Sequence, residues 1–374
     1  MKPEERLILL LSRVGLSPEA SESASRLLSG QIDWDMFIEQ ANANGVSPLI
    51  YKNLKDMKGV PEEILSRLEG IYRVCLRNNV INADEADRVI AVFKRASIPV
   101  IPLKGSLVSE YIFRDIGLYP AGDIDILVRH SDLNKATEVL LADGYTQIGH
   151  ERDFLEGSYH LPYMGQSCLV ELHWNLAFRY FDIPPDFWWE DTVVQEHNGR
   201  SYILLSPERY VMYTAFRLYA RGFTPLRFLV IIREITRHYR DVLDYHRLME
   251  FSARYRMVKL MSFTLGLLNE LLDAEVPPVC PDTGREVFTT KRGHRFLRRL
   301  VLSGFFKGVK RPSIRMAVFT LLQDSVAETF MVLLKRLFPG LSEIALRYDI
   351  PPNSKKIYLY YILNPLLLIL RRRR

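Results

Sequence analysis

Two aspartates stand inside an apolar segment of this 374-residue chain. Asp123 and Asp125 alternate with isoleucine in DIDILV, residues 123–128, a pattern that predicts a buried β-strand. Residues two apart in a strand point to the same face, about 7 Å apart, so the two carboxylates would share one face of the sheet. Paired carboxylates near a core need a countercharge, because their desolvation and mutual repulsion are both costly. Mg²⁺ or Mn²⁺ would supply it through oxygen ligands; the alternative is a half-exposed strand with an acidic outer face.

A third carboxylate occurs in a similar setting further along the chain. LVELHW, residues 169–174, places Glu171 between apolar residues, with His173 on the same side of the predicted strand. If this strand lies beside the first, Glu171 could bind a second metal ion or activate a hydroxyl group. His173 could position an acceptor or bind metal weakly, and a purely structural role is the alternative.

A short turn precedes the aspartates. Lys104, Gly105 and Ser106 follow the apolar run at residues 98–103 and open a predicted helix. The backbone N–H groups and the dipole at a helix N-terminus can hold a phosphate group. Three carboxylates together with a phosphate-binding turn fit phosphoryl chemistry that uses two metal ions.

The surrounding pattern predicts three regions. Residues 1–96 show helical periodicity, residues 97–205 mix strands and helices, and residues 206–374 are helical again. Mixed elements of this kind indicate an α/β or α+β domain in the middle of the chain. Strands are expected at five places: residues 98–103, 123–128, 159–163, 168–174 and 202–205.

Composition and charge set the broad class of protein. With 48% apolar and 25% charged residues the composition is that of an ordinary soluble protein, and the length allows two or three domains. The net charge of +6 is a weak indication of a polyanionic partner. The three cysteines, Cys75, Cys168 and Cys280, have neither disulfide-framework nor zinc-site spacing. Glu4 and Glu5 stand where a signal peptide needs positive charge, so a cytoplasmic location is expected.

The last apolar run is bracketed by basic residues. IYLYYILNPLLLIL, residues 357–370, lies between Lys355-Lys356 and four arginines. It is too short to span a bilayer as a helix and contains an Asn-Pro step that we expect to interrupt it. The favoured interpretation is a segment docked on the rest of the protein. Weak contact with an anionic membrane surface through this C-terminal tail is the alternative.

These motifs together resemble a known family. The segments PVIPLKGSLVSEYI, AGDIDILVRHSDLNKATEVLLADGY, VELHW and LSPERYVMYTAFR are similar to those of a poorly characterised bacterial nucleotidyltransferase family of the polymerase-β-like superfamily. The family's Leu-Lys-Gly turn matches residues 103–105, its acidic pair matches Asp123 and Asp125, and the acid of its (D/E)LHW strand matches Glu171. The likeness runs from about Pro99 to Leu229.

The resemblance implies a fold and an activity. The expected fold is α+β, a central nucleotidyltransferase domain with a small mixed sheet and flanking helices, between helical regions. The expected reaction transfers a nucleoside monophosphate from an NTP, with ATP favoured, to an acceptor hydroxyl and releases pyrophosphate. Asp123, Asp125 and Glu171 would bind Mg²⁺ or Mn²⁺. Contacts with the phosphates are assigned to Lys104, Gly105, Ser106 and Arg227.

The chain also departs from the family pattern. Tyr119 stands where members often carry arginine before the acidic pair, and Phe216 and Arg217 stand where relatives often have histidine. A non-catalytic nucleotide-binding or scaffold protein is therefore one alternative.

A helical ribonuclease is a further alternative. Its loose Arg-x4–6-His spacing is matched by Arg233 with His238 and by Arg240 with His246. For the transferase, a small-molecule or protein acceptor is favoured over RNA, because no basic stripe with interleaved aromatic residues appears. The sequence leaves the oligomeric state open.

Overall fold

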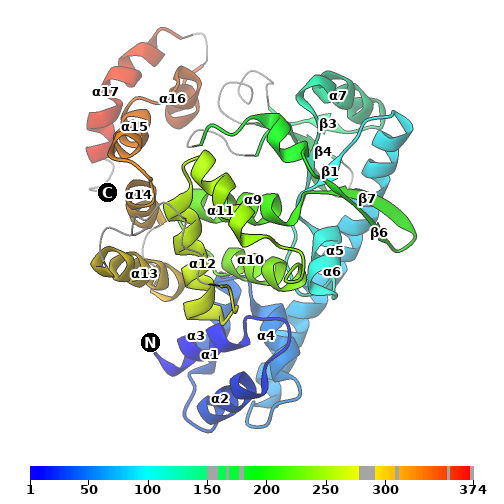
Figure 1. Cartoon of the computed structure of the whole chain (residues 1–374), viewed down its shortest axis with the longest axis vertical. Helices are drawn as coiled ribbons and strands as arrows, with labels where there is room; N and C mark the ends of the chain where they lie inside the picture. The colour runs from blue at the N-terminus through cyan, green and yellow to red at the C-terminus, as the bar shows by residue number, and fades with distance from the viewer. Residues whose placement is uncertain are drawn as a thin grey trace.

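The structure is a computed structural model that describes residues 1–149, 159–165, 168–176, 181–277, 291–307, 311–351 and 354–370. It confirms the expected α+β class, because a small mixed sheet lies among many helices (Figure 1). 

The chain begins with five helices. Residues with strong helix-start signals open two of them: Ser17 accepts a hydrogen bond from the Ala20 N–H before α2, and Asp33 accepts one from the Met36 N–H before α3. α5 is 34 residues long and runs up one side of the molecule from the N-terminal helices to the sheet (Figure 1). The helices are α1 (Pro3–Leu11), α2 (Pro18–Leu28), α3 (Trp34–Ala43), α4 (Ser47–Leu54) and α5 (Glu62–Arg95).

The central region holds a five-stranded sheet in the order β1-β2-β5-β4-β3 and a separate β6-β7 hairpin. β2 and β5 pair in parallel, and the other pairs are antiparallel. The strands are β1 (Ile101–Pro102), β2 (Asp123–Leu127), β3 (Thr146–Gln147), β4 (His160–Met164), β5 (Leu169–His173), β6 (Val193–His197) and β7 (Arg200–Leu204). Helical segments in this region are α6 (Ser106–Phe113), α7 (Leu133–Ala142) and the 3₁₀ turns η1 (His130–Asp132) and η2 (Pro185–Trp189).

All five predicted strands are present, although β1 is only two residues long. β3 and β6 were not expected. β6 is largely exposed and pairs only with β7, so it lacks the apolar pattern of a buried strand. Its signal was the turn: Asn198 and Gly199 both have positive φ, +49° and +73°, as an Asn-Gly hairpin turn requires.

The two faces of the sheet differ in chemistry. The isoleucines of β2, Ile124 and Ile126, pack with Val89 and Phe93 of α5 and with Leu140 of α7 in one apolar core. The acidic side chains of β2 and β5 lie on the opposite face. Successive side chains of a strand point to opposite faces, so the sequence of β2 predicts this separation of apolar and acidic residues.

A series of helices completes the chain. One buried core joins the helices before residue 96 to those after residue 206, so these parts pack as one body. The division into residues 1–96, 97–205 and 206–374 remains a prediction. The helices are α9 (Pro207–Ala220), α10 (Arg227–His238), α11 (Tyr245–Arg254), α12 (Val258–Leu272), α13 (Lys291–Phe306), α14 (Arg311–Leu321), α15 (Val326–Leu337), α16 (Leu341–Tyr348) and α17 (Lys356–Leu370).

The C-terminal apolar run forms one helix. α17 continues through Pro365, so the expected interruption at the Asn-Pro step is wrong. Asn364, fully buried, donates to the Leu337 carbonyl and accepts from Arg347 and Tyr348. These contacts hold α17 against its neighbours at the position where the proline removes a helical hydrogen bond. Within the described ranges, no helix has both the length and the apolar character needed to cross a membrane.

Candidate active site

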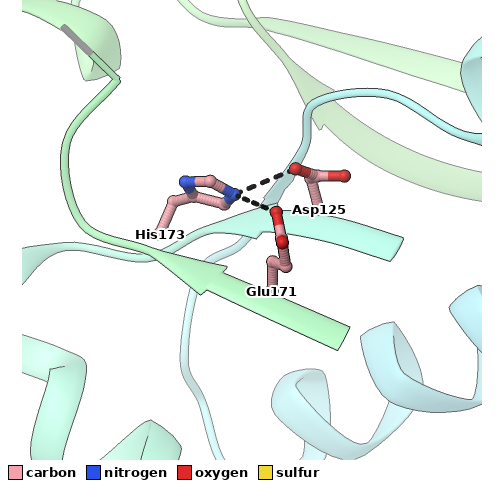
Figure 2. Close-up of side chains that lie close together, drawn as sticks. All are labelled: Asp125, Glu171 and His173. Atoms are coloured by element: carbon pink, nitrogen blue, oxygen red, sulfur yellow. Dashed lines mark hydrogen bonds and ion pairs between the residues drawn. The ribbon is translucent and has the colours of Figure 1, made fainter. Parts of the chain in front are cut away.

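Two neighbouring strands bring three titratable side chains together. Asp125 on β2 lies directly opposite Glu171 on β5 in the parallel register. The Nε2 atom of His173 is 3.0 Å from Asp125 Oδ1 and 3.5 Å from Glu171 Oε2 (Figure 2). The donor atoms of these three residues all lie within 4.8 Å of one another. The structure thus places Glu171 beside the aspartate pair, on the adjacent strand.

Lys104 supplies the countercharge in this arrangement. Its Nζ atom is 2.7 Å from Asp123 Oδ2 and 2.7 Å from Asp125 Oδ2. Burial and the nearby Arg217 guanidinium lower the pKa of Lys104 to about 8, while Asp123 opposes that change. The lysine that was expected to contact phosphates therefore lies between the two carboxylates.

The donor set suits a hard divalent cation. Asp125 Oδ2 is buried and forms an ion pair with Lys104 Nζ at a distance of 2.7 Å. Among the described residues, this oxygen has no hydrogen-bond partner of standard geometry. Burial raises the pKa of Glu171, but opposing interactions, among them the hydrogen bond with His173 and the charge of Lys104, lower that pKa to about 2. Burial lowers the pKa of His173, which favours the neutral imidazole that can act as a ligand. Ionised carboxylates are the ligands that Mg²⁺ and Mn²⁺ prefer, and a neutral imidazole would add at most a weaker ligand for these ions.

We expect Lys104→Met to lower the free energy of unfolding by about 3 kcal/mol in a chelating buffer, because it leaves two carboxylates without their cation. Millimolar Mn²⁺ should restore part of that loss by taking the position between the carboxylates. Urea denaturation with and without Mn²⁺ measures both effects. Lys94→Met, at an exposed position at the end of α5, is the control. An unfolding free energy equal to that of the wild type in chelator would contradict the role of Lys104 as countercharge.

A cavity of about 280 Å³ opens beside the aspartates and is lined by cations. Three arginines face it: Arg217 on α9, Arg221 directly after α9, and Arg227 on α10. Among the described residues, none of the three has an ion pair with a carboxylate, and Arg227 Nε is buried without a hydrogen-bond partner. Burial and repulsion from Arg217 and Arg227 lower the pKa of Arg221. Three cations that repel one another around a cavity favour a polyanionic ligand.

A second cavity, of about 170 Å³, contains the carboxylates themselves. Asp125, Glu171 and His173 line it together with Tyr213 and Phe216 of α9. The two cavities share four lining residues and therefore lie side by side; these are Lys104, Asp123, Arg217 and Arg221.

Most of the residues singled out from the sequence meet here. The lining of the two cavities includes Lys104, Gly105, Asp123, Asp125, Glu171, His173 and Arg227. Ser106 begins α6 next to them, and its side chain lies outside the described part of the structure. Arg217 and Arg221 were not expected from the sequence as cationic residues of the site. Their spacing of four residues, at the end of a predicted helix, places them on one helical face and was the available signal.

The turn before α6 needs glycine. Gly105 has φ +96°, a conformation that side chains rarely adopt, and it faces the arginine-lined cavity. The N-terminus of the eight-residue helix α6 therefore starts at the cavity.

The loop before β2 forms another wall of this cavity, and α5 holds it in place. The buried Asn79 side chain donates to the carbonyls of Ile116 and Tyr119 and accepts from the Ala121 N–H. Tyr119, the departure from the family pattern, is buried in this loop and lines the cavity. The arginines that face this cavity come from α9, its C-terminal end and α10 instead of from this loop.

We expect Asn79→Ala to lower the free energy of unfolding by about 3 kcal/mol, because one buried and two partly buried backbone groups would lose their partners. Asn78→Ala, one position earlier and exposed on the same helix, should change it by less than about 0.5 kcal/mol. Urea denaturation of both variants gives the comparison. Equal stability of the two would show that Asn79 does not support the loop.

The Arg–His pairs of the ribonuclease alternative have other surroundings. Arg233 donates to the Leu272 carbonyl and pairs with Glu234, whereas His238 packs against Tyr111 at 4.5 Å between ring centroids. His246 is exposed and lies 3.3 Å from Glu250. Neither histidine lines the cavities described above, so this geometry does not favour the ribonuclease.

Comparison with protein families gives one match. A family model described as "Uncharacterised nucleotidyltransferase" matches residues 30–273, a range that contains both cavities. Comparisons with curated proteins and with solved structures find no match.

Proposed function

The chain belongs to this uncharacterised nucleotidyltransferase family, and from that premise we propose that it transfers a nucleoside monophosphate from an NTP to an acceptor hydroxyl. The observation that carries the proposal is the position of three carboxylates next to a cavity with three arginines. A triphosphate needs both features, cations along its length and acidic ligands for its metal.

Asp123, Asp125 and Glu171 would hold Mg²⁺ or Mn²⁺, with His173 as a further ligand or as a positioning group. When bound, the cation would neutralise phosphate charge and polarise the reacting phosphoryl group. The pKa of about 2 keeps Glu171 ionised at neutral pH. Its carboxylate would orient the acceptor hydroxyl and favour loss of its proton.

The remaining cations would bind the triphosphate. We assign the β- and γ-phosphates to the Gly105 amide, the Ser106 N-terminus of α6 and the three arginines. Lys104 lines both cavities, so its ammonium group can move from the carboxylates to the phosphates when a metal takes its place. The acceptor oxygen then forms a bond to the α-phosphorus while the bond to the α,β-bridging oxygen breaks, and pyrophosphate leaves.

The identity of the nucleotide, the class of acceptor and the location of the protein are also proposals. We propose ATP as the nucleotide and a small molecule or a protein hydroxyl as the acceptor. The second cavity supports this acceptor class, because its volume is only about 170 Å³ and His160, Tyr213 and Phe216 give it a partly aromatic lining. We place the protein in the cytoplasm, with weak membrane contact through its C-terminal tail.

Comparing ATP labelled at different phosphates tests the proposed reaction. The protein is incubated with Mg²⁺ or Mn²⁺, a cell extract, and ATP labelled at either the α- or the γ-phosphate. We expect the α-label in an acceptor and the γ-label in pyrophosphate. Transfer of the γ-label would instead show a kinase. Metal-dependent ATP binding without any labelled product would favour the non-catalytic nucleotide-binding protein.

A further inference from the structure

The last three helices carry an exposed apolar surface. We call residues 325–370, which contain α15, α16 and α17, the C-terminal helical unit. In this unit Val326 is 86% exposed and Ile362 is 71% exposed. Exposed apolar side chains of the unit on and next to α15 are Val326, Phe330, Met331, Leu334, Leu337, Phe338 and Leu341, and those on α17 are Tyr358, Leu359, Ile362, Leu363 and Leu366.

Their spacing places them on helix faces. Positions 326, 330, 334 and 338 recur every four residues, and so do positions 358, 362 and 366. The ring centroids of Phe338, directly after α15, and Tyr361 on α17 lie 5.8 Å apart, which brings the end of α15 beside α17.

This surface is separate from the core of the unit. Ile344, Ile350 and Ile357 form a small buried cluster between α16 and α17, and Asn364 ties α17 to its neighbours by hydrogen bonds. α16 and α17 lie at the outer edge of the molecule, away from the sheet (Figure 1). The exposed side chains therefore face outward from a unit whose own core is already filled.

The net charge of the chain resides in this unit and in the four arginines that follow it: the unit itself has five basic and three acidic residues, a net of +2. Residues 325–374 contain nine lysines and arginines against three acidic residues, a net of +6. The whole chain has 50 basic and 44 acidic residues, also a net of +6, so residues 1–324 are neutral overall. Lys355 and Lys356 precede the apolar face of α17, and Arg371–Arg374 follow it in the sequence.

We propose that the C-terminal helical unit docks on an anionic membrane surface, with its apolar side chains inserted at the interface and its basic residues against lipid phosphates. α17 has 15 residues, about 22 Å of helix, which is shorter than a bilayer core of about 30 Å, so it would lie along the surface. The charge of this surface favours an anionic membrane over a second copy of the chain as its partner. Two copies meeting through this surface would bring two patches of the same sign together, whereas anionic lipid is complementary. The proposal extends the tail contact to a defined surface and does not depend on nucleotidyl transfer.

Vesicle sedimentation of the full chain tests the proposal. The vesicles are phosphatidylcholine alone, or phosphatidylcholine with roughly one third phosphatidylglycerol. We expect the wild type to partition at least about tenfold more strongly onto the anionic vesicles, and high salt to weaken that binding.

Three variants distinguish the contributions of apolar and basic side chains to vesicle binding. Phe330→Asp with Ile362→Asp alters two outward-facing side chains, 63% and 71% exposed, and should lower binding by about tenfold or more. Lys355→Glu with Lys356→Glu should lower binding to the anionic vesicles. The control is Val242→Asp, at a position 67% exposed outside the unit, which should bind as the wild type does.

Three results would overturn the proposal. The first is a wild type without preference for anionic vesicles. The second is wild-type binding by the Phe330→Asp, Ile362→Asp variant with an intact circular dichroism spectrum, since charge alone would then explain the binding. The third is a wild-type dimer in sedimentation equilibrium that the same variant dissociates, without any vesicle binding, which would assign the surface to a second copy.

Discussion

Asp125→Asn is expected to lower nucleotidyl transfer by about 10³-fold or more while the protein stays folded. Asp125 is 2% exposed and lies at the centre of the site, next to Lys104, Glu171 and His173. Asparagine has the same shape and can still accept the hydrogen bond from His173. It removes the negative charge that a metal ligand must supply, so the loss should appear in the reaction rather than in the fold.

The measurement is the rate of label transfer from α-labelled ATP, with circular dichroism and thermal melting to establish folding. Asp84→Asn is the matched control, because Asp84 is exposed on α5. Transfer by Asp125→Asn at a rate within a few-fold of the wild type would remove Asp125 from the catalytic site.

Arg217→Met is expected to lower kcat/KM for the nucleotide by about 10²-fold, mainly by raising KM. Arg217 lines both cavities, so its guanidinium can contact the phosphates between the arginine cluster and the carboxylates. Of the described residues, none forms an ion pair with it, and its charge is available to a ligand. Arg217→Lys keeps the charge but loses the planar donor geometry, and should recover only part of the loss.

Steady-state kinetics over a range of ATP concentrations distinguishes KM from kcat for both variants. Arg77→Met, at an exposed position on α5, controls for the loss of one arginine. An unchanged KM in Arg217→Met would show that the arginine-lined cavity does not bind the triphosphate.

The local patterns were predictable from the sequence. Asp123 and Asp125 share a face because a strand alternates with a period of two, and the isoleucines between them fill the core. Gly105 was predictable as part of a turn because its position follows an apolar run and opens a helix. Such signals depend on neighbours in the chain.

The spatial arrangement was not predictable in the same way. The register of Asp125 with Glu171 joins residues 46 positions apart, and no local pattern fixes which strands pair. Lys104 was assigned to phosphates, yet its ammonium group lies between the carboxylates, because a buried acidic pair without metal needs a cation. Arg217 reaches the site because α9 lines the same cavity as β2 and β5, an arrangement that no local pattern predicts. The Asn-Pro step was expected to interrupt the last apolar run, yet α17 continues through Pro365, and Asn364 makes hydrogen bonds to distant residues that the sequence does not reveal.

Binding of Mn²⁺ in the presence of a non-hydrolysable ATP analogue shows whether the carboxylates of β2 and β5 hold a metal ion. Electron paramagnetic resonance measures how much Mn²⁺ the protein immobilises beyond what the analogue binds alone. We expect the wild type and Asp84→Asn to immobilise the ion, and Asp125→Asn and Glu171→Gln not to do so. Equal immobilisation by all four proteins would contradict this expectation, because the metal would then bind without the carboxylates of β2 and β5.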